Sequence, residues 1–178
     1  AAIEDIFIET GFPKDLFRNF LISSQQVANL IEHPTITAVT LTGSKSAGRS
    51  VAEKAGKMLK KSLLELGGSD PYIILEDADL DRTVETCVTS RLLNSGQSCI
   101  AAKRFVVVEN IHKQFEEVLV EKMRSKKMGD PLDEETEIGP QARADLREDL
   151  HRQVTQSIEK GAVCLSGGEV PDGPSDFY

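Results

Sequence analysis

The sequence predicts an α/β protein with parallel strands, because short runs rich in β-branched and apolar residues alternate with segments of helical apolar spacing. The first third follows the order strand, helix, strand, helix, strand, and strands joined through helices pair in parallel. Gly67, Gly68 and Pro71 then interrupt the pattern. Residues 1–68 hold 8 basic and 7 acidic side chains, whereas residues 69–178 hold 13 and 22. We therefore expect two α/β parts that meet at about residue 68.

The first part is expected to contain three strands and three amphipathic helices. The strands are predicted at residues 17–22, 38–42 and 62–66. Ser23 and Ser24 precede the second helix and can cap it. The apolar faces are Ile3, Ile6 and Phe7 in the first helix, Val27, Leu30 and Ile31 in the second, and Ala47, Val51, Ala55, Met58 and Leu59 in the third.

The second part is expected to begin with a strand at residues 72–75, followed by a helix that Asp79 can cap. Further strands are predicted at residues 105–108 and 162–165, and residues 94–98 break the helical pattern. The buried helix faces are Leu80, Val84, Cys87, Val88 and Leu92 in the first, Ile111, Phe115, Val118, Leu119 and Met123 in the second, and Leu146, Leu150, Val154 and Ile158 in the third.

Composition narrows the classes of protein that this chain can belong to. A net charge of −8 and the absence of a basic stretch argue against a nucleic-acid partner. Hydrophobic residues make up 39% of the chain, which is enough for a folded core, and no apolar run is long enough for a membrane span. The first residues lack the pattern of a signal peptide, so we expect a cytoplasmic protein. Three cysteines without framework spacing predict reduced thiols.

Cys99 is the candidate nucleophile, because it lies in a loop between a helix and a strand, with Gly96 three residues before it. Cys87 lies on a helix's apolar face and Cys164 in a predicted strand, so both are expected to be small buried hydrophobic residues. The three histidines stand in no motif. Glu65 is the candidate base, because a carboxylate between leucines at a strand end is expected to be partly desolvated, which raises its pKa.

Three further features have weaker signals. Gly43 and Ser44 join a strand to a helix whose first backbone N–H groups can face a phosphate, although no phosphate-binding fingerprint is complete there. Arg91 and Lys103 flank the loop of Cys99, and a solvated or ion-paired surface role is expected for each. The acidic residues 133–135 predict a solvated turn, since they lack metal-ligand spacing, and no metal site is expected.

Three segments taken together, in this order, resemble the NAD(P)-dependent aldehyde dehydrogenase superfamily. They are Leu-Thr-Gly-Ser at 41–44, Leu-Glu-Leu-Gly-Gly at 64–68 and Gly-Gln-Ser-Cys at 96–99, and the spacing of 34 residues between the Glu and the Cys is typical of that family. Shorter matches follow at residues 77–80, 102–105, 128–131 and 138–140. The chain looks most similar to the succinate-semialdehyde dehydrogenase branch, although Ser69 replaces the lysine of many relatives.

The resemblance implies a role for each matched residue. Cys99 would attack the aldehyde and form first a thiohemiacetal and then a thioester, and its backbone N–H would help to hold the oxyanion. Glu65 would be the base that activates Cys99 or the hydrolytic water. The cofactor would be NAD or NADP: Gly43 and Ser44 would meet its pyrophosphate, Leu66 and Gly67 its nicotinamide, and Pro13 its adenine.

The family's fold implies that residues 1–68 are the C-terminal part of a Rossmann-like NAD(P)-binding domain and that residues 69–178 begin an α/β catalytic domain. Family members are close to 500 residues long and form homodimers or homotetramers, so we expect a central fragment of such an enzyme that is inactive alone. A CoA-acylating relative and a catalytically incomplete structural or binding module remain open alternatives. If the chain is part of an aldehyde-oxidising enzyme, the expected substrate is succinate semialdehyde or a similar short aldehyde.

Overall fold

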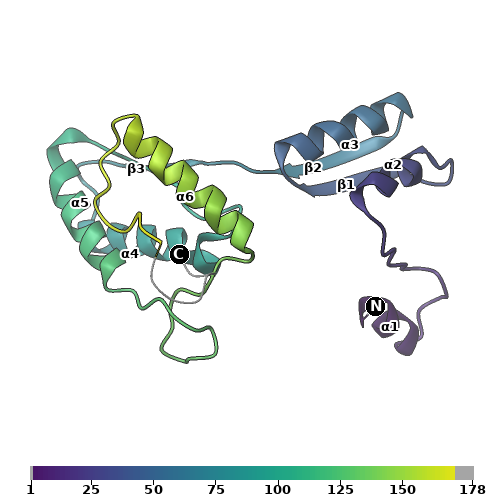
Figure 1. The fold of residues 1–178 in the computed structure, drawn as a ribbon, viewed down its shortest axis with the longest axis horizontal. Coiled ribbons are helices and arrows are strands. Elements are labelled where there is room, and N and C mark those ends of the chain that lie inside the picture. Colours follow the sequence, from purple (N-terminus) through teal and green to yellow (C-terminus); the bar gives the residue numbers. More distant parts are fainter. Residues whose placement is uncertain (1, 171–178) are drawn as a thin grey trace. The chain divides into compact units, whose positions relative to one another are not determined.

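The computed structural model describes residues 2–170, which divide between Gly67 and Gly68 into two compact units, unit 1 and unit 2 (Figure 1). Unit 1 contains α1 (Ala2–Glu9), α2 (Ser24–Glu32), β1 (Ala38–Gly43), α3 (Lys45–Lys57) and β2 (Lys61–Leu66). Unit 2 contains β3 (Pro71–Ile74), α4 (Leu80–Leu92), the 3₁₀ turn η1 (Leu93–Gly96), β4 (Arg104–Val107), α5 (Glu109–Arg124) and α6 (Ala144–Glu159). The predicted α/β class with parallel strands is confirmed.

Unit 1 is built around the parallel pair β1–β2, which α3 connects (Figure 1). In the register of this pair, Leu41 lies beside Leu64 and Gly43 beside Leu66. Leu41 and Leu64 are partly buried, and the side chain of Leu66 reaches Gly48 of α3. Since side chains alternate along a strand, Leu64 and Leu66 share one face of the pair and Glu65 points to the other.

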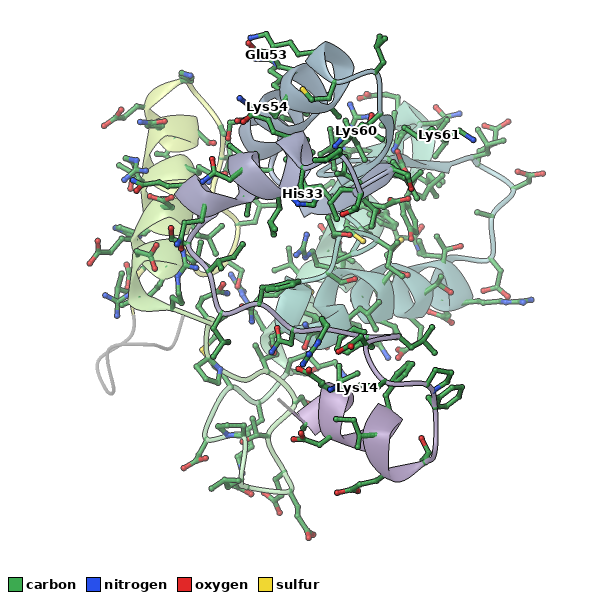
Figure 2. All side chains as sticks on the ribbon, turned by 90° about the vertical axis from the view of Figure 1, so that its right-hand side faces the viewer. Lys14, His33, Glu53, Lys54, Lys60 and Lys61 are labelled. Atoms are coloured by element: carbon green, nitrogen blue, oxygen red, sulfur yellow. The ribbon has the colours of Figure 1, made fainter. Side chains whose placement is uncertain are left out.

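Two lysines bind the C-terminal end of α2, Lys54 of α3 and Lys60 just before β2, and both are labelled in Figure 2 with His33. Lys60 Nζ donates to the carbonyls of Ile31 and His33, the latter at 2.6 Å, and so binds the C-terminal end of α2. Lys54 Nζ forms an ion pair of 2.6 Å with Glu32 Oε1. The predicted cap of α2 is confirmed, because Ser23 is its N-cap.

Unit 2 packs α4 and α5 around the parallel pair β3–β4. Its core consists of Ile74, Val84, Cys87, Val88 and Phe115. Three of the five residues predicted for the inner face of α4 are in this core, and the other two, Leu80 and Leu92, are partly buried and pack against it. The predicted cap is confirmed, since Asp79 Oδ1 accepts from the Arg82 backbone N–H at 3.1 Å. No helix within residues 2–170 is both long and apolar enough to cross a membrane.

Two predicted strands are not strands in the structure. Residues 17–22 form exposed irregular chain in which the Phe17 ring stacks on Phe7 at 5.4 Å and the Asn19 N–H donates to Glu4. Residues 162–165 are also irregular, and the Leu165 carbonyl accepts from Arg124 Nη2 at 2.6 Å. A strand needs a neighbouring strand to pair its backbone groups. In the described part of each unit, these segments bond to side chains and to nearby backbone: the Ile22 N–H donates to the Phe20 carbonyl and the Ala162 N–H to the Ser157 carbonyl, each at 3.0 Å.

We expect Gly48→Ala to be less stable than the matched variant Gly56→Ala by about 1–3 kcal/mol, the usual cost of overpacking. A Cβ at Gly48 would lie 2.6 Å from Leu66 Cδ2, whereas a Cβ at Gly56 would meet nothing within 4 Å. Both glycines lie in α3, so both variants gain the same helix propensity of about 1 kcal/mol. Urea unfolding followed by circular dichroism measures the difference. Equal stabilities would show that Leu66 moves aside without cost.

Candidate active site

Cys99 is exposed, on the irregular segment that connects η1 to β4. Two buried alanines anchor this segment just after the cysteine, since Ala101 is 3% and Ala102 2% exposed. The Ala101 N–H donates to the Ser98 carbonyl at 3.1 Å, and the Ala102 N–H donates to the Ser90 carbonyl of α4 at 3.0 Å. The thiol is therefore open to solvent while the backbone next to it is fixed.

The turn before Cys99 has an unusual backbone, because three consecutive residues have positive φ. The values are 52° at Asn94, 54° at Ser95 and 77° at Gly96. Only glycine adopts this region freely, and a non-glycine residue there costs on the order of 1–3 kcal/mol unless its surroundings hold it. Strain of this kind gathers at functional sites.

Side chains of that turn bind a distant segment, residues 139–142. Ser95 Oγ accepts from the Gly139 N–H at 2.9 Å. Gln97 uses both ends of its amide: Nε2 donates to the Pro140 carbonyl at 3.1 Å, and Oε1 accepts from the Ala142 N–H at 2.8 Å. These three bonds bridge more than 40 residues of sequence and hold the strained turn in place.

The prediction that Arg91 is a solvated or ion-paired surface residue is wrong. It is partly buried in the last turn of α4, and its guanidinium donates to two backbone carbonyls, of Gly96 and Ala102, each at 2.7 Å. Burial lowers the pKa of this guanidinium from its usual value. The signal was present in the sequence: Arg91 follows Cys87 and Val88 at helical spacing, so it falls on the buried face of α4.

Lys103 also differs from the expectation, although it is exposed. Its ammonium group donates to the backbone carbonyls of Cys99 at 3.0 Å and Ala101 at 3.1 Å. The side chain thus turns back onto the loop of the candidate nucleophile. Sequence reasoning missed this contact because it depends on the course of the backbone after Cys99.

The other two cysteines have different surroundings. Cys87 is buried in the core of unit 2, as predicted, and burial raises the pKa of its thiol, which disfavours the reactive thiolate. Cys164 was expected to be buried in a strand, but it is exposed in irregular chain, where its thiol donates to the carbonyls of Ser166 and Gly167. Exposure alone therefore does not separate Cys99 from Cys164.

Glu65 lies in β2 of unit 1, opposite Thr42 in the register. It is exposed, so the desolvation predicted from its leucine neighbours is absent. The reason is the alternation of strand side chains, which sends Leu64 and Leu66 to the face opposite Glu65. Glu65 and Cys99 belong to different units, and their pairing as base and nucleophile stays a prediction.

Four of the five predicted cofactor residues gather at one end of the β1–β2 pair. Gly43 and Leu66 are register partners at the carboxyl ends of the two strands, and Ser44 and Gly67 follow them directly. Ser44 is the N-cap of α3, and its Oγ accepts from the Ala47 N–H at 3.2 Å. The carboxyl ends of parallel strands are where open α/β sheets bind ligands.

The fifth residue, Pro13, lies in the exposed chain between α1 and α2, where its carbonyl accepts from the Leu16 N–H at 3.2 Å. The acidic turn at residues 133–135 is exposed, and its Asp133 and Glu135 form ion pairs with Lys127 at 3.5 and 2.8 Å. The turn is thus held by a lysine, as expected of a charged surface segment.

Comparison with known proteins gives the class of this α/β chain. The profile described as "Aldehyde dehydrogenase family" matches residues 1–178. The chain is 45% identical to a succinate-semialdehyde dehydrogenase [NADP(+)] of Mycobacterium avium, over 99% of this chain and 37% of that protein. It is also 45% identical to a probable succinate-semialdehyde dehydrogenase [NADP(+)] of Synechocystis, over 99% of this chain and 39% of that protein.

A solved structure is also similar. The succinic semialdehyde dehydrogenase from Streptococcus pyogenes, in complex with NADP+, superposes with a TM-score of 0.95 at 40% identity, over 99% of this chain and 39% of that one. The chain therefore belongs to the aldehyde dehydrogenase family, and the resemblance found in the three motifs is confirmed. It spans less than two fifths of the length of these relatives.

Proposed function

We propose that this chain is the central part of an enzyme that oxidises succinate semialdehyde, or a similar short aldehyde, to the carboxylic acid with NADP+. The observation that carries the proposal is the exposed thiol of Cys99 on a braced loop, in a chain 45% identical to relatives named for this activity. An exposed thiol on a fixed backbone can meet a substrate in one geometry, which is what nucleophilic catalysis requires.

Cys99 is the nucleophile in this proposal. Its thiolate forms a carbon–sulfur bond with the aldehyde carbon, and the aldehyde oxygen becomes the oxyanion of a thiohemiacetal, which the Cys99 backbone N–H helps to hold. NADP+ bound here would supply the acceptor for the hydride that leaves this carbon, and Cys99 would then hold a thioester. Attack by water then breaks the carbon–sulfur bond, releases the acid and returns the thiol.

Glu65 is the base in this proposal. It accepts a proton from the Cys99 thiol or from the water that hydrolyses the thioester. Its exposure in β2, and its position at the carboxyl end of a parallel pair, support access to a substrate or water. The carboxylate then returns its proton to solvent before the next turnover.

The end of the β1–β2 pair fits a dinucleotide. The first backbone N–H groups of a helix have no partner within it, and the helix dipole favours an anion there. The first turn of α3 contains no acidic residue that would repel a pyrophosphate. We assign the pyrophosphate to Gly43 and Ser44, the nicotinamide side to Leu66 and Gly67, and the adenine to Pro13.

This proposal also assigns the two units. Unit 1 is the C-terminal part of the Rossmann-like cofactor domain, and unit 2 is the first part of the catalytic domain. The complete enzyme would form a homodimer or homotetramer. The exposed apolar side chains of α1, Ile3, Ile6 and Ile8, support further packing of unit 1 in the complete protein.

Purified complete enzyme that contains this chain tests the proposal. We expect NADPH to form with succinate semialdehyde, at a higher kcat/KM than with an aldehyde of equal length that lacks the carboxylate. The product is the free acid, with or without CoA in the assay. Formation of an acyl-CoA would favour the acylating alternative, and absence of any aldehyde-dependent NADPH or NADH would contradict the proposal.

A further inference from the structure

Two cationic side chains donate hydrogen bonds to four backbone carbonyls of the segment that carries Cys99. Arg91 binds the carbonyls of Gly96 and Ala102, and Lys103 binds those of Cys99 and Ala101. A hydrogen bond from a charged donor is stronger than a neutral one. These contacts therefore oppose any change in the course of the loop.

Arg91 has the stronger position of the two. Its two N–H groups reach the first and last residues of the segment 96–102, so one rigid planar group spans both ends of the loop. It is partly buried, whereas Lys103 is exposed and flexible. A partly buried guanidinium loses part of its hydration and needs these two acceptors, which makes the arrangement costly to change.

The position of the Arg91 guanidinium requires a residue without a side chain at Gly96. A Cβ at this position would lie 2.3 Å from Arg91 Nη2, and the φ of 77° disfavours any side chain. The glycine thus leaves room for the guanidinium in addition to allowing the turn. The strained residues Asn94 and Ser95 come directly before it, so the Arg91 contact lies where the chain most needs support.

We propose that Arg91 is a positioning residue for Cys99: by joining the Gly96 and Ala102 carbonyls, it fixes the direction of the Cys99 thiol and backbone N–H toward the substrate. The role of Cys99 in this inference rests on the proposed function. Arg91 itself touches no substrate, and it acts through the backbone of the loop. Lysine can replace it only in part, because an ammonium on a flexible stem keeps the charge but does not present two donors in a fixed plane.

The test compares Arg91→Ala and Arg91→Lys with Arg82→Ala in the complete enzyme. Arg82 is exposed on the same helix, so its variant removes the same charge without touching the loop. We expect kcat to fall roughly 10- to 100-fold in Arg91→Ala and less in Arg91→Lys, since charged hydrogen bonds are lost. The KM for NADP+ should stay at the wild-type value in the Arg91 variants. Arg82→Ala should also keep the wild-type kcat.

Chemical rescue adds a readout that general damage would not give. Millimolar guanidinium should restore part of the kcat of Arg91→Ala, and the same concentration of sodium chloride should not. Wild-type kcat in Arg91→Ala, or a loss that guanidinium does not relieve, would overturn the proposal.

Hydrogen exchange keeps the inference separate from the proposed function. The amides of Ala101 and Ala102 should exchange faster in Arg91→Ala than in Arg82→Ala, whether or not an aldehyde is oxidised. Unchanged exchange at these amides would overturn the positioning role. Faster exchange in a protein whose wild type oxidises no aldehyde would support the loop contact and contradict the proposed function.

Discussion

Replacing Cys99 by serine will lower kcat/KM for aldehyde oxidation by roughly 10⁴-fold or more, the scale seen when a nucleophile is removed. A thiol is a few per cent ionised near neutral pH, whereas a serine hydroxyl is not and needs a dedicated base. The change replaces one sulfur by oxygen at an exposed position, so stability should change by less than about 0.5 kcal/mol. Steady-state kinetics and urea unfolding on the same preparations measure both quantities.

Cys164→Ser is the matched control, because Cys164 is the other exposed cysteine in the described part of the chain. Its variant should keep wild-type kinetics. Wild-type turnover in Cys99→Ser would remove the nucleophile from the proposed function. Loss of activity in both variants would mean that the two thiols act together, which the single-nucleophile scheme does not allow.

The elements that the sequence predicted correctly are those with strong local signals. Apolar spacing placed α3, α4 and α5, and Asp79 and Ser23 placed two caps. Residues 17–22 and 162–165 have the composition of strands but lack a partner in the described part of their units. Pairing is a long-range property, so a single segment cannot reveal it.

The features of the site that depend on neighbouring residues in the sequence could be predicted. The loop position of Cys99 and the strand end of Glu65 follow from the sequence, and the structure has both. The prediction that Glu65 is partly desolvated was wrong, because its neighbours Leu64 and Leu66 point to the opposite face of the strand pair. The burial of Arg91 could have been predicted from its helical spacing to Cys87 and Val88, but its partners could not, because they are backbone carbonyls and no residue type indicates them.

Replacing Glu65 by glutamine will slow steady-state turnover by about 10²–10⁴-fold, the usual contribution of a general base, while one NADPH per active site still forms rapidly. The two half-reactions differ in how much they need the base. A thiol is a strong nucleophile and needs little help to attack an aldehyde, whereas water is a far weaker acid and needs a base to attack the thioester. Rapid-mixing measurements of NADPH formation separate the first turnover from the later ones.

Glu53→Gln is the control for this variant, because Glu53 is an exposed carboxylate of the same unit that forms an ion pair of 2.6 Å with Lys57. It should behave as wild type. If Glu65→Gln loses the rapid first turnover as well, Glu65 acts on the thiol of Cys99 rather than on water. If both phases keep their wild-type rates, another group is the base, and the strand end of β2 serves the cofactor alone, since Leu66 and Gly67 follow Glu65 directly.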